Sequence, residues 1–503
     1  MHVHRSRDRG ILRNRAGISA TQLHHDFSAV GALGRGPSHV SRSASLWYGG
    51  LAVTRRELLL LAGSGLTPAR GLAHHLAIGA WAGLQPSPAG TADVTLRIGE
   101  MSLELGPRRT VKTLAYNGRV PGPLLRVTEG HPLSVDVWND TDHEEFVHWH
   151  GLLIPSDVDG AREEGTPPVP PRGGRRRYVF TPTPSGTRWY HSHGMAGGNL
   201  RRTTYSGQFG LLLVDSGHER GAYDLEVPIV LHEWDARLTS QGPLDVEYRY
   251  QSVNGRMLGA GEPVRVRHGQ RVLFRILNAS ATLTHRLALP GHLFHVTALD
   301  GYPVPNPRSV PVVEVAPGER VDAVVTMDQA GIWIFGDVDS AHRAAGLGVV
   351  VEYAGASGAP RWLPAPPVAW DYKQFAGSEE PREPDGRLTL VFRSTAGGHH
   401  WTINGQSHPR IDDIVVDVNR RYRWILDNQS AHPHPIHLHR HAMDLVRHAR
   451  TPCSGIRKDV IVVPAWQQVE IEVSATQPGP SLFHCHQQLH MDRGFMALVR
   501  YSA

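Results

Sequence analysis

Near its C-terminal end the chain reads His484-Cys485-His486-Gln487-Gln488-Leu489-His490-Met491-Asp492-Arg493-Gly494-Phe495-Met496. The residues before His484 have the pattern of a strand end, and side chains on a strand alternate between its two faces. His484 and His486 are therefore expected on one side and Cys485 on the other. Cys485 can share one metal ion with His490 while its two neighbours hold another. A thiolate with imidazoles is the ligand set of a blue copper site, and two metal centres joined through one residue indicate electron transfer.

Three further histidine clusters precede this stretch. They are His148-Trp149-His150, His191-Ser192-His193 and His434-Pro435-Ile436-His437-Leu438-His439. On a strand, both rings of a His-x-His pair point to the same side, so four such pairs can converge at one interface. With all four motifs in this order, residues 92–503 resemble the multicopper oxidase family, of which the laccases are the best-known members.

The resemblance implies four copper ions: one type 1, one type 2 and a type 3 pair. Transferred residue by residue, it assigns His434, Cys485 and His490 to type 1 copper, and His148 and His437 to type 2 copper. The type 3 ligands would be His150, His191, His193, His439, His484 and His486. It also places Asp159 beside the type 2 copper as a residue that delivers protons. A solvated loop aspartate is the alternative interpretation of Asp159.

The chain departs from the family pattern at two positions. Several bacterial members carry glutamate directly after the last ligand histidine, where this chain has Met491, so a second proton relay is not expected there. The axial position of type 1 copper falls on Phe495, which cannot coordinate and predicts a high-potential site, although a one-residue bulge would substitute Met496. Asp459 matches a position at which family members have an acid near the type 1 site. It is expected either to receive a proton from the substrate or to have a structural role.

Composition favours a soluble all-β protein. The 503 residues are 40% hydrophobic and 20% charged, and 53 glycines with 37 prolines suit short strands joined by turns. The net charge of +5 does not indicate nucleic-acid binding, because ten arginines and only three acidic residues lie in the first 90 positions. Of the two cysteines, Cys485 is expected to bind metal, which leaves Cys453 as a free thiol without an assigned role.

Residues 1–90 are predicted to form a leader outside the folded body. Residues 1–50 lack periodicity and are expected to be disordered, and translation is expected to start near Val53. Thr54-Arg55-Arg56-Glu57 precedes an apolar run and resembles a twin-arginine export signal, which predicts a periplasmic or extracellular protein. A basic, unstructured leader is the alternative. No stretch reaches the ~18 apolar residues of a membrane span.

The body is predicted to contain three strand-rich blocks, at residues 91–216, 224–353 and 388–503, with a proline-rich linker at 354–387. An Asn-Gly turn recurs once in each block, which indicates a weak internal repeat. The family resemblance implies three cupredoxin-like Greek-key β-sandwich domains, the middle one spacing the outer two. Residues 160–177 are expected to be a mobile loop. The histidines of the middle block form no ligand motif and are interpreted as core or surface residues.

The expected function is that of a laccase-like oxidase. It would couple one-electron oxidation of phenols or aromatic amines to the four-electron reduction of dioxygen to water. A cuprous or other metal-ion oxidase is the first alternative, but the eight methionines are scattered, which favours organic substrates. A non-enzymatic copper-binding member of the same fold is the second alternative. The oligomeric state is left open.

Overall fold

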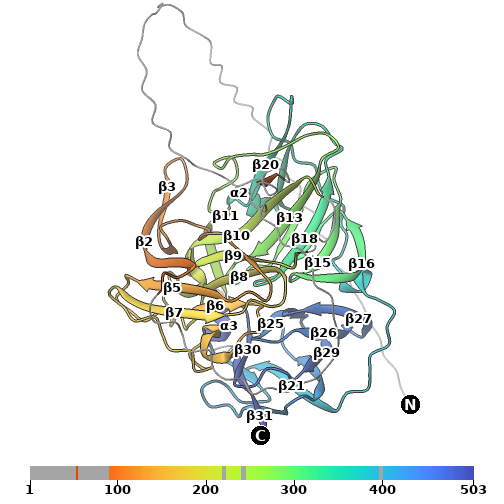
Figure 1. Cartoon of the computed structure of the whole chain (residues 1–503). Coiled ribbons are helices and arrows are strands. Elements are labelled where there is room, and N and C mark those ends of the chain that lie inside the picture. The colour runs from red at the N-terminus through yellow and green to blue at the C-terminus, as the bar shows by residue number, and fades with distance from the viewer. Residues whose placement is uncertain (1–52, 55–89, 218–222, 240–244, 396–399, 503) are drawn as a thin grey trace, which may run out of the picture. The chain divides into compact units, whose positions relative to one another are not determined.

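The computed structural model describes residues 53–54, 90–217, 223–239, 245–395 and 400–502, all within one compact unit, residues 50–503 (Figure 1). These residues are almost entirely strands and turns, which confirms the predicted all-β class. The expected disordered segment and the paired arginines of the expected signal lie outside the described residues. Within the predicted leader, Val53–Thr54 form β1, a two-residue strand paired with Glu226 and Leu225 of β10.

The first block contains two four-stranded sheets, drawn in orange and yellow in Figure 1. One has the order β3 (Arg109–Tyr116), β2 (Val94–Gly106), β5 (Leu133–Asn139), β7 (Gly174–Phe180). The other has the order β4 (Leu125–Thr128), β9 (Phe209–Asp215), β8 (Gly186–Ser192), β6 (Val147–His150). A buried cluster joins residues of both sheets, including Val135 of β5 and Leu212 of β9. The pair of sheets therefore packs as a β-sandwich.

The second block contains a seven-stranded and a five-stranded sheet. The larger has the order β1, β10 (Leu225–Leu238), β13 (Arg271–Asn278), β18 (Arg320–Thr326), β15 (Phe294–Leu299), β16 (Tyr302–Val310), with β11 (Val246–Val253) paired to β10. The smaller has the order β12 (Val264–Val266), β20 (Gly348–Tyr353), β19 (Ile332–Asp337), β14 (His285–Ala288), β17 (Val313–Val315). Phe274 of β13 stacks on Phe335 of β19 across the space between the sheets.

The third block contains a six-stranded and a five-stranded sheet, drawn in blue in Figure 1. The first has the order β22 (Trp401–Ile403), β21 (Gly386–Ser394), β24 (Arg421–Asn428), β29 (Gln468–Ser474), β26 (Met443–His448), β27 (Thr451–Lys458). The second has the order β23 (Ile414–Asp417), β31 (Met496–Ser502), β30 (Ser481–Cys485), β25 (His434–Leu438), β28 (Val460–Val463). Its central strands, β30 and β25, carry the predicted ligand motifs.

Helices are short wherever the structure describes the chain. They are α1 (Ser156–Asp159), η2 (Thr203–Tyr205), α2 (Ser340–Ala344), η3 (Tyr372–Phe375) and α3 (Gln488–Asp492). None of these described helices is long and apolar enough to cross a membrane. Tyr372 and Phe375 of η3 are buried in the core shared by the second and third blocks. The predicted linker is therefore anchored at this point.

The three Asn-Gly turns have the same conformation and the same contacts. Both residues of each turn have positive φ, at Asn117-Gly118, Asn254-Gly255 and Asn404-Gly405. In each, the asparagine Oδ1 accepts a backbone N–H of a neighbouring strand, and its Nδ2 donates to a carbonyl two residues earlier on that strand. Asparagine and glycine tolerate positive φ better than other residues, which explains why this pair recurs. The internal repeat predicted from sequence is thus structural.

The segment predicted as a mobile loop at residues 160–177 is a loop only as far as residue 173. Its last four residues, from Gly174, begin strand β7, which pairs with β5. Before that strand, Glu145 and Val169 exchange two backbone hydrogen bonds, and Ala161 and Glu164 are buried. Residues 160–173 form the predicted loop, but residues 174–177 do not, because the pairing of β7 with β5 joins positions far apart in the sequence.

Strand β8, which carries His191 towards the site, begins at a close backbone contact with the second block. Gly186 has a φ of +124°, and a β-carbon there would lie 2.1 Å from the carbonyl oxygen of Gly301. Gly301 follows β15 in the tight turn to β16. Only glycine satisfies both the dihedral angle and the contact.

Substitution Gly186→Ala is expected to lower the free energy of unfolding by about 3 kcal/mol or more, because strain at positive φ adds to a backbone clash. The control Gly118→Ala, also at positive φ but with no atom within 4 Å of the added methyl group, is expected to cost about 1 kcal/mol. Denaturant unfolding of the two variants measures both values. Equal losses would contradict the proposed role of the Gly301 contact.

Candidate metal centre

Strand pairing brings the histidine motifs together in twos. In the first block, β6 pairs with β8 so that His148 lies opposite His191. In the third block, β25 pairs with β30 so that His437 lies opposite His484 and Ile436 lies opposite Cys485. Each pair of strands therefore presents several imidazole rings on one face.

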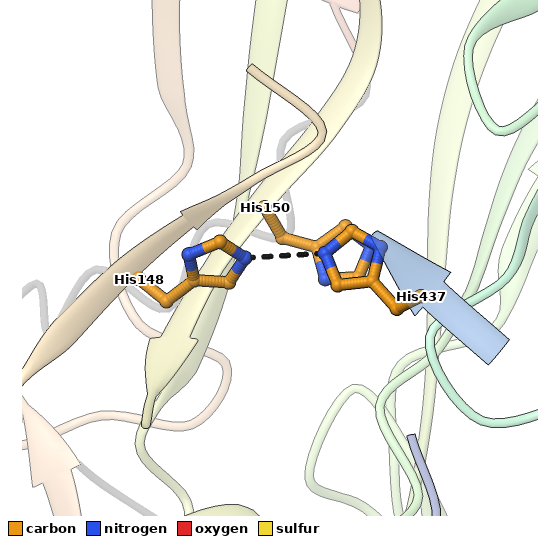
Figure 2. Close-up of side chains that lie close together, drawn as sticks. All are labelled: His148, His150 and His437. Carbon is orange, nitrogen blue, oxygen red and sulfur yellow. Dashed lines mark hydrogen bonds between the residues drawn. The ribbon is translucent and has the colours of Figure 1, made fainter. Parts of the chain in front are cut away.

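The faces of the two strand pairs meet. The Nε2 atoms of His148 and His437 approach within 3.4 Å, as the dashed line in Figure 2 shows, although the residues are 289 positions apart. The rings of His150 and His437 stack 3.8 Å apart and almost parallel, and those of His148 and His439 stack at 3.9 Å. The first and third blocks thus share one buried cluster of histidines.

Every predicted ligand falls into one of four groups whose ligand atoms lie within 4.8 Å of one another. The groups are His148 with His150 and His437; His150 with His191 and His486; His193 with His439 and His484; and His434 with Cys485 and His490. All members are buried. The alternation expected around Cys485 is therefore present, since its neighbours join the second and third groups while Cys485 joins the fourth.

The fourth group has the dimensions of a three-coordinate metal site. The Nδ1 atoms of His434 and His490 are 3.2 Å apart, and the Cys485 Sγ lies 3.8 Å and 3.5 Å from them. A point equidistant from the three atoms is about 2.0 Å from each, close to the length of a metal–imidazole bond. α3, directly after β30, supplies His490.

Burial favours the neutral form, which binds metal, for most of these imidazoles. Burial, followed by the neighbouring histidines, lowers the pKa of His150, His191, His193, His434, His437 and His484 well below the ordinary value. Burial likewise lowers the pKa of His486 and of His490 to about 3. It raises the pKa of the Cys485 thiol, so a positive ion is needed to stabilise the thiolate.

Several ring nitrogens of the cluster have no hydrogen-bond partner. They include Nδ1 of His150, Nε2 of His191 and of His193, and both nitrogens of His486. The Nδ1 atoms of His148, His191, His437 and His484 instead donate to backbone carbonyls at 2.7–2.9 Å. Such a hydrogen bond fixes the tautomer and leaves Nε2 free to coordinate. Buried nitrogens without partners are costly, and metal ions would satisfy them.

Phe495, rather than Met496, faces the Cys485 group. The ring of Phe495 lies 4.7 Å from that of His434, and Phe495 shares a buried cluster with Cys485. Met496 packs in a different cluster, with Ala161, Leu482 and Met491. Trp401 also lies against both His434 and His490. The surroundings of this group are therefore aromatic.

Asp159 is fully buried, so the alternative of a solvated loop aspartate is wrong. Its Oδ2 accepts from Nδ1 of His439 at 2.9 Å and lies 3.2 Å from Nδ1 of His148. Burial opposes ionisation, but His148 and His439 lower the pKa of Asp159 far below its ordinary value. The sequence did not point to Glu164, whose Oε1 lies 3.3 Å from Nδ1 of His439 and accepts the Leu482 N–H. Burial and Asp159 raise the pKa of Glu164.

Asp459 lies behind the histidine cluster and not at a substrate-accessible rim. Its side chain is fully buried, its Oδ1 accepts from Nε2 of His150 at 3.1 Å, and its carbonyl oxygen accepts from Nδ1 of His437 at 2.7 Å. Arg320 donates to both carboxylate oxygens at 2.6 Å, and Arg188 donates to one at 3.2 Å. Asp459 cannot receive a proton from a substrate in solution, because the two arginines enclose it.

This carboxylate belongs to a buried network in which three cations balance three acids. Arg188, Arg320 and Lys458 supply the cations, and Asp300, Glu319 and Asp459 supply the acids. All three blocks contribute members. Burial disfavours the positive charge of Arg320 and of Lys458. The carboxylates outweigh this effect: Asp459 and Asp300 raise the pKa of Arg320, and Asp300 and Glu319 raise the pKa of Lys458. The network therefore fixes the position of Asp459, which contacts both His150 and His437.

Middle-block histidines have hydrogen-bond partners of their own. Nδ1 and Nε2 of His285 contact Asp337 and Glu233 at 2.8 and 2.6 Å, and these carboxylates, against the effect of burial, raise the pKa of His285 to about 9. His292 contacts the Tyr353 hydroxyl. Cys453 is a buried free cysteine, and burial raises its pKa to about 12. A thiol of such a pKa is unreactive at neutral pH.

Known proteins similar to this chain include multicopper oxidases and a laccase, and the similarity extends over most of the chain. Three family models described as multicopper oxidase match residues 98–219, 240–351 and 382–503. Multicopper oxidase MmcO of Mycobacterium tuberculosis is 29% identical, covering 84% of this chain and 90% of that protein. A laccase of Cryphonectria parasitica is 25% identical, covering 78% of each. The crystal structure of a multicopper oxidase from Pseudomonas thermotolerans, 26% identical, matches 82% of this chain and 100% of its own with a TM-score of 0.65.

Substitution Arg320→Met is expected to lower the free energy of unfolding of the metal-free protein by about 3–5 kcal/mol, since it leaves buried carboxylates without their main partner. The control Arg265→Met removes an exposed pair with Glu262 and is expected to cost less than about 1 kcal/mol. Denaturant unfolding compares the two. A similar small loss in both variants would show that the buried network does not stabilise the fold.

Proposed function

The chain belongs to the multicopper oxidase family of oxidoreductases, and from this premise we propose that it is a laccase-like oxidase of phenols and aromatic amines. It would take four electrons from four substrate molecules, one at a time, and reduce one dioxygen to two waters with four protons. The observation that carries the proposal is the meeting of all eleven predicted ligands in four buried groups. A non-enzymatic copper-binding protein would not need this complete set.

The groups fit copper because they combine buried neutral imidazoles with one thiol. We propose that His434, Cys485 and His490 hold type 1 copper, His148 and His437 type 2 copper, and the remaining six histidines the type 3 pair. Bound copper would supply one-electron redox chemistry at the group of His434, Cys485 and His490 and dioxygen reduction at the other groups. Cys485 is joined by peptide bonds to His484 and His486, so a short covalent path links the two regions. The strand rise of about 3.3 Å per residue keeps it short.

The protein's acids control protons beside the cluster. His148 and His439, against the effect of burial, lower the pKa of Asp159, whereas burial and Asp159 raise the pKa of the adjacent Glu164, since a second negative charge is disfavoured there. This pair can hold and release one proton at His439. We propose that Asp159 serves in proton delivery on this side of the cluster.

An organic substrate is favoured by what surrounds the Cys485 group. Trp401 and Phe495 contact its histidines, while Met491 and Met496 pack in a different cluster. Met195 is the exposed methionine in the described part of the chain, and it lies beside His193 instead. A soft thioether for cuprous ions is therefore not placed at this group. The similarity to a protein named laccase supports the same choice.

The twin-arginine pattern at Arg55 and Arg56 supports a further proposal, that the protein is exported to the periplasm or beyond the cell. That route carries folded proteins, which suits a chain whose proposed ligands come from both ends of its body.

Copper-loaded protein is expected to show an intense blue absorption band and to consume dioxygen with a phenol faster than with cuprous ions. The Cys485→Ser variant should lose the blue band while keeping its fold, because serine cannot supply the thiolate. Absorption spectra and parallel oxygen-uptake assays measure both. Faster uptake with cuprous ions would favour the metal-ion oxidase, and a colourless wild-type protein would refute the proposal.

Substitution Phe495→Met is expected to lower the reduction potential of the blue site, because a thioether in the axial position stabilises the oxidised metal. Met496→Leu is the control, since Met496 packs away from the Cys485 group. A redox titration that follows the blue band gives both potentials. An unchanged potential in Phe495→Met would show that residue 495 is not axial.

A further inference from the structure

A cavity of about 250 Å³ opens beside His193, and Asp159 is not among its lining residues. It is lined by Ser192, His193 and Gly194 at the end of β8, by Glu144 and Glu145 before β6, and by the segments around Arg162, Met195 and Arg202. The volume has room for several water molecules. Several bacterial members of the family carry a glutamate at the position of Met491, which is buried in this chain.

Glu145 connects this cavity to the protein surface. Glu145 is 4% exposed, and Nε2 of His143 donates to its Oε1 at 2.7 Å. Nδ1 of His143 donates to Asp142 at 2.8 Å, and the side chains of His143 and Asp142 are 25% and 86% exposed. An unbroken series of hydrogen bonds thus runs from solvent through an imidazole to a buried acid.

The inner end of the series is fixed against the end of β8, beside two predicted ligands. Oε2 of Glu145 accepts from Ser192 Oγ and from Gln208 Nε2, both at 3.1 Å. Ser192 lies between His191 and His193. The backbone of Glu145 is held by two hydrogen bonds with Val169. The carboxylate therefore has a defined position in the cavity wall.

We propose that Asp142, His143 and Glu145 form a proton relay from solvent into the cavity beside His193, supplying dioxygen reduction independently of Asp159. This inference rests on the proposed oxidase function. Each of the four electrons delivered requires one proton. The Nε2–H bond of protonated His143 breaks as an O–H bond forms on Glu145, and the acid then releases that proton to water in the cavity. His143 takes its next proton from solvent.

The charges around the relay support this direction. The hydrogen bond to Glu145, opposed by burial and aided by Asp142, raises the pKa of His143 above its ordinary value, so the ring stays protonated to higher pH. Arg202 acts in the opposite sense. Around the cavity lie the ion pair of Arg162 with Glu144, and Glu163. Tyr116 and Tyr178 feel the Glu145 charge but remain neutral, since burial raises the pKa of both.

Glu145→Gln is the decisive variant because it can keep every hydrogen bond. Its amide oxygen can accept from Ser192 and Gln208, and its NH₂ group can donate to Nε2 of neutral His143. Only the transferable proton is lost. His143→Gln interrupts the relay at a partly exposed position, where folding is least affected. Glu144→Gln is the matched control, since Glu144 lines the same cavity but pairs with Arg162 at the surface.

The experiment follows reoxidation of the substrate-reduced, copper-loaded protein by dioxygen between about pH 6 and 8, in H₂O and D₂O. Glu145→Gln and His143→Gln are expected to slow reoxidation about tenfold, shift its alkaline limb to lower pH and change the solvent isotope effect. In both variants, the rate at which a phenol bleaches the blue band without dioxygen should be unchanged. In Glu144→Gln, the reoxidation rate, its pH dependence and the isotope effect should also be unchanged. In metal-free protein, NMR titration should show a lower His143 pKa in Glu145→Gln.

Unchanged reoxidation and isotope effect in His143→Gln would overturn the relay, as would an equal slowing in Glu144→Gln or an unchanged His143 pKa. If Glu145→Gln did not fold, His143→Gln would decide alone. A wild-type protein with no blue band and no oxygen uptake would instead refute the proposed function, which is a distinguishable result.

Discussion

The two ends of the body are connected through the alternation of side chains on β30. His484 points to the interface with the first block, where its Nε2 lies 3.1 Å from that of His439, while Cys485 points the opposite way, to His434 and His490. The pairing of β25 with β30 sets both arrangements at once. A shift of one residue would exchange the two faces, so neither group can exist without this register.

The middle block contributes to the site without supplying a predicted ligand. Arg320, at the start of β18, holds both oxygens of Asp459, and Asp459 in turn contacts His150 and His437. Removing water from six charged groups is unfavourable unless their geometry is well matched. The network therefore makes the relative placement of first and third blocks depend on the second, which goes beyond the spacing role implied by the sequence.

Short sequence motifs predicted the ligands and the turns. They did not predict which acidic residues are buried, because burial depends on contacts between distant positions. The histidine pairs and the Asn-Gly turns act through strand alternation and positive φ, which are local properties visible in sequence. The burial of Asp459, Glu164 and Glu145 depends on partners such as Arg320, 139 positions from Asp459, and Leu482, 318 positions from Glu164. No local pattern distinguishes such an acid from a solvated one. Glu145 could have been suspected only from its two-residue spacing to His143.

The 289 positions between His148 and His437 have a consequence for biosynthesis. A nascent chain that has completed its first block displays only the β6 and β8 half of the cluster. The other half appears only when β25 and β30, which lie far behind β6 and β8 in the chain, have left the ribosome and paired. Contacts between such distant segments form late in folding, because a long loop must be closed first. The complete set of proposed ligands is therefore assembled only in a late step, and chains truncated before β25 would lack half of it.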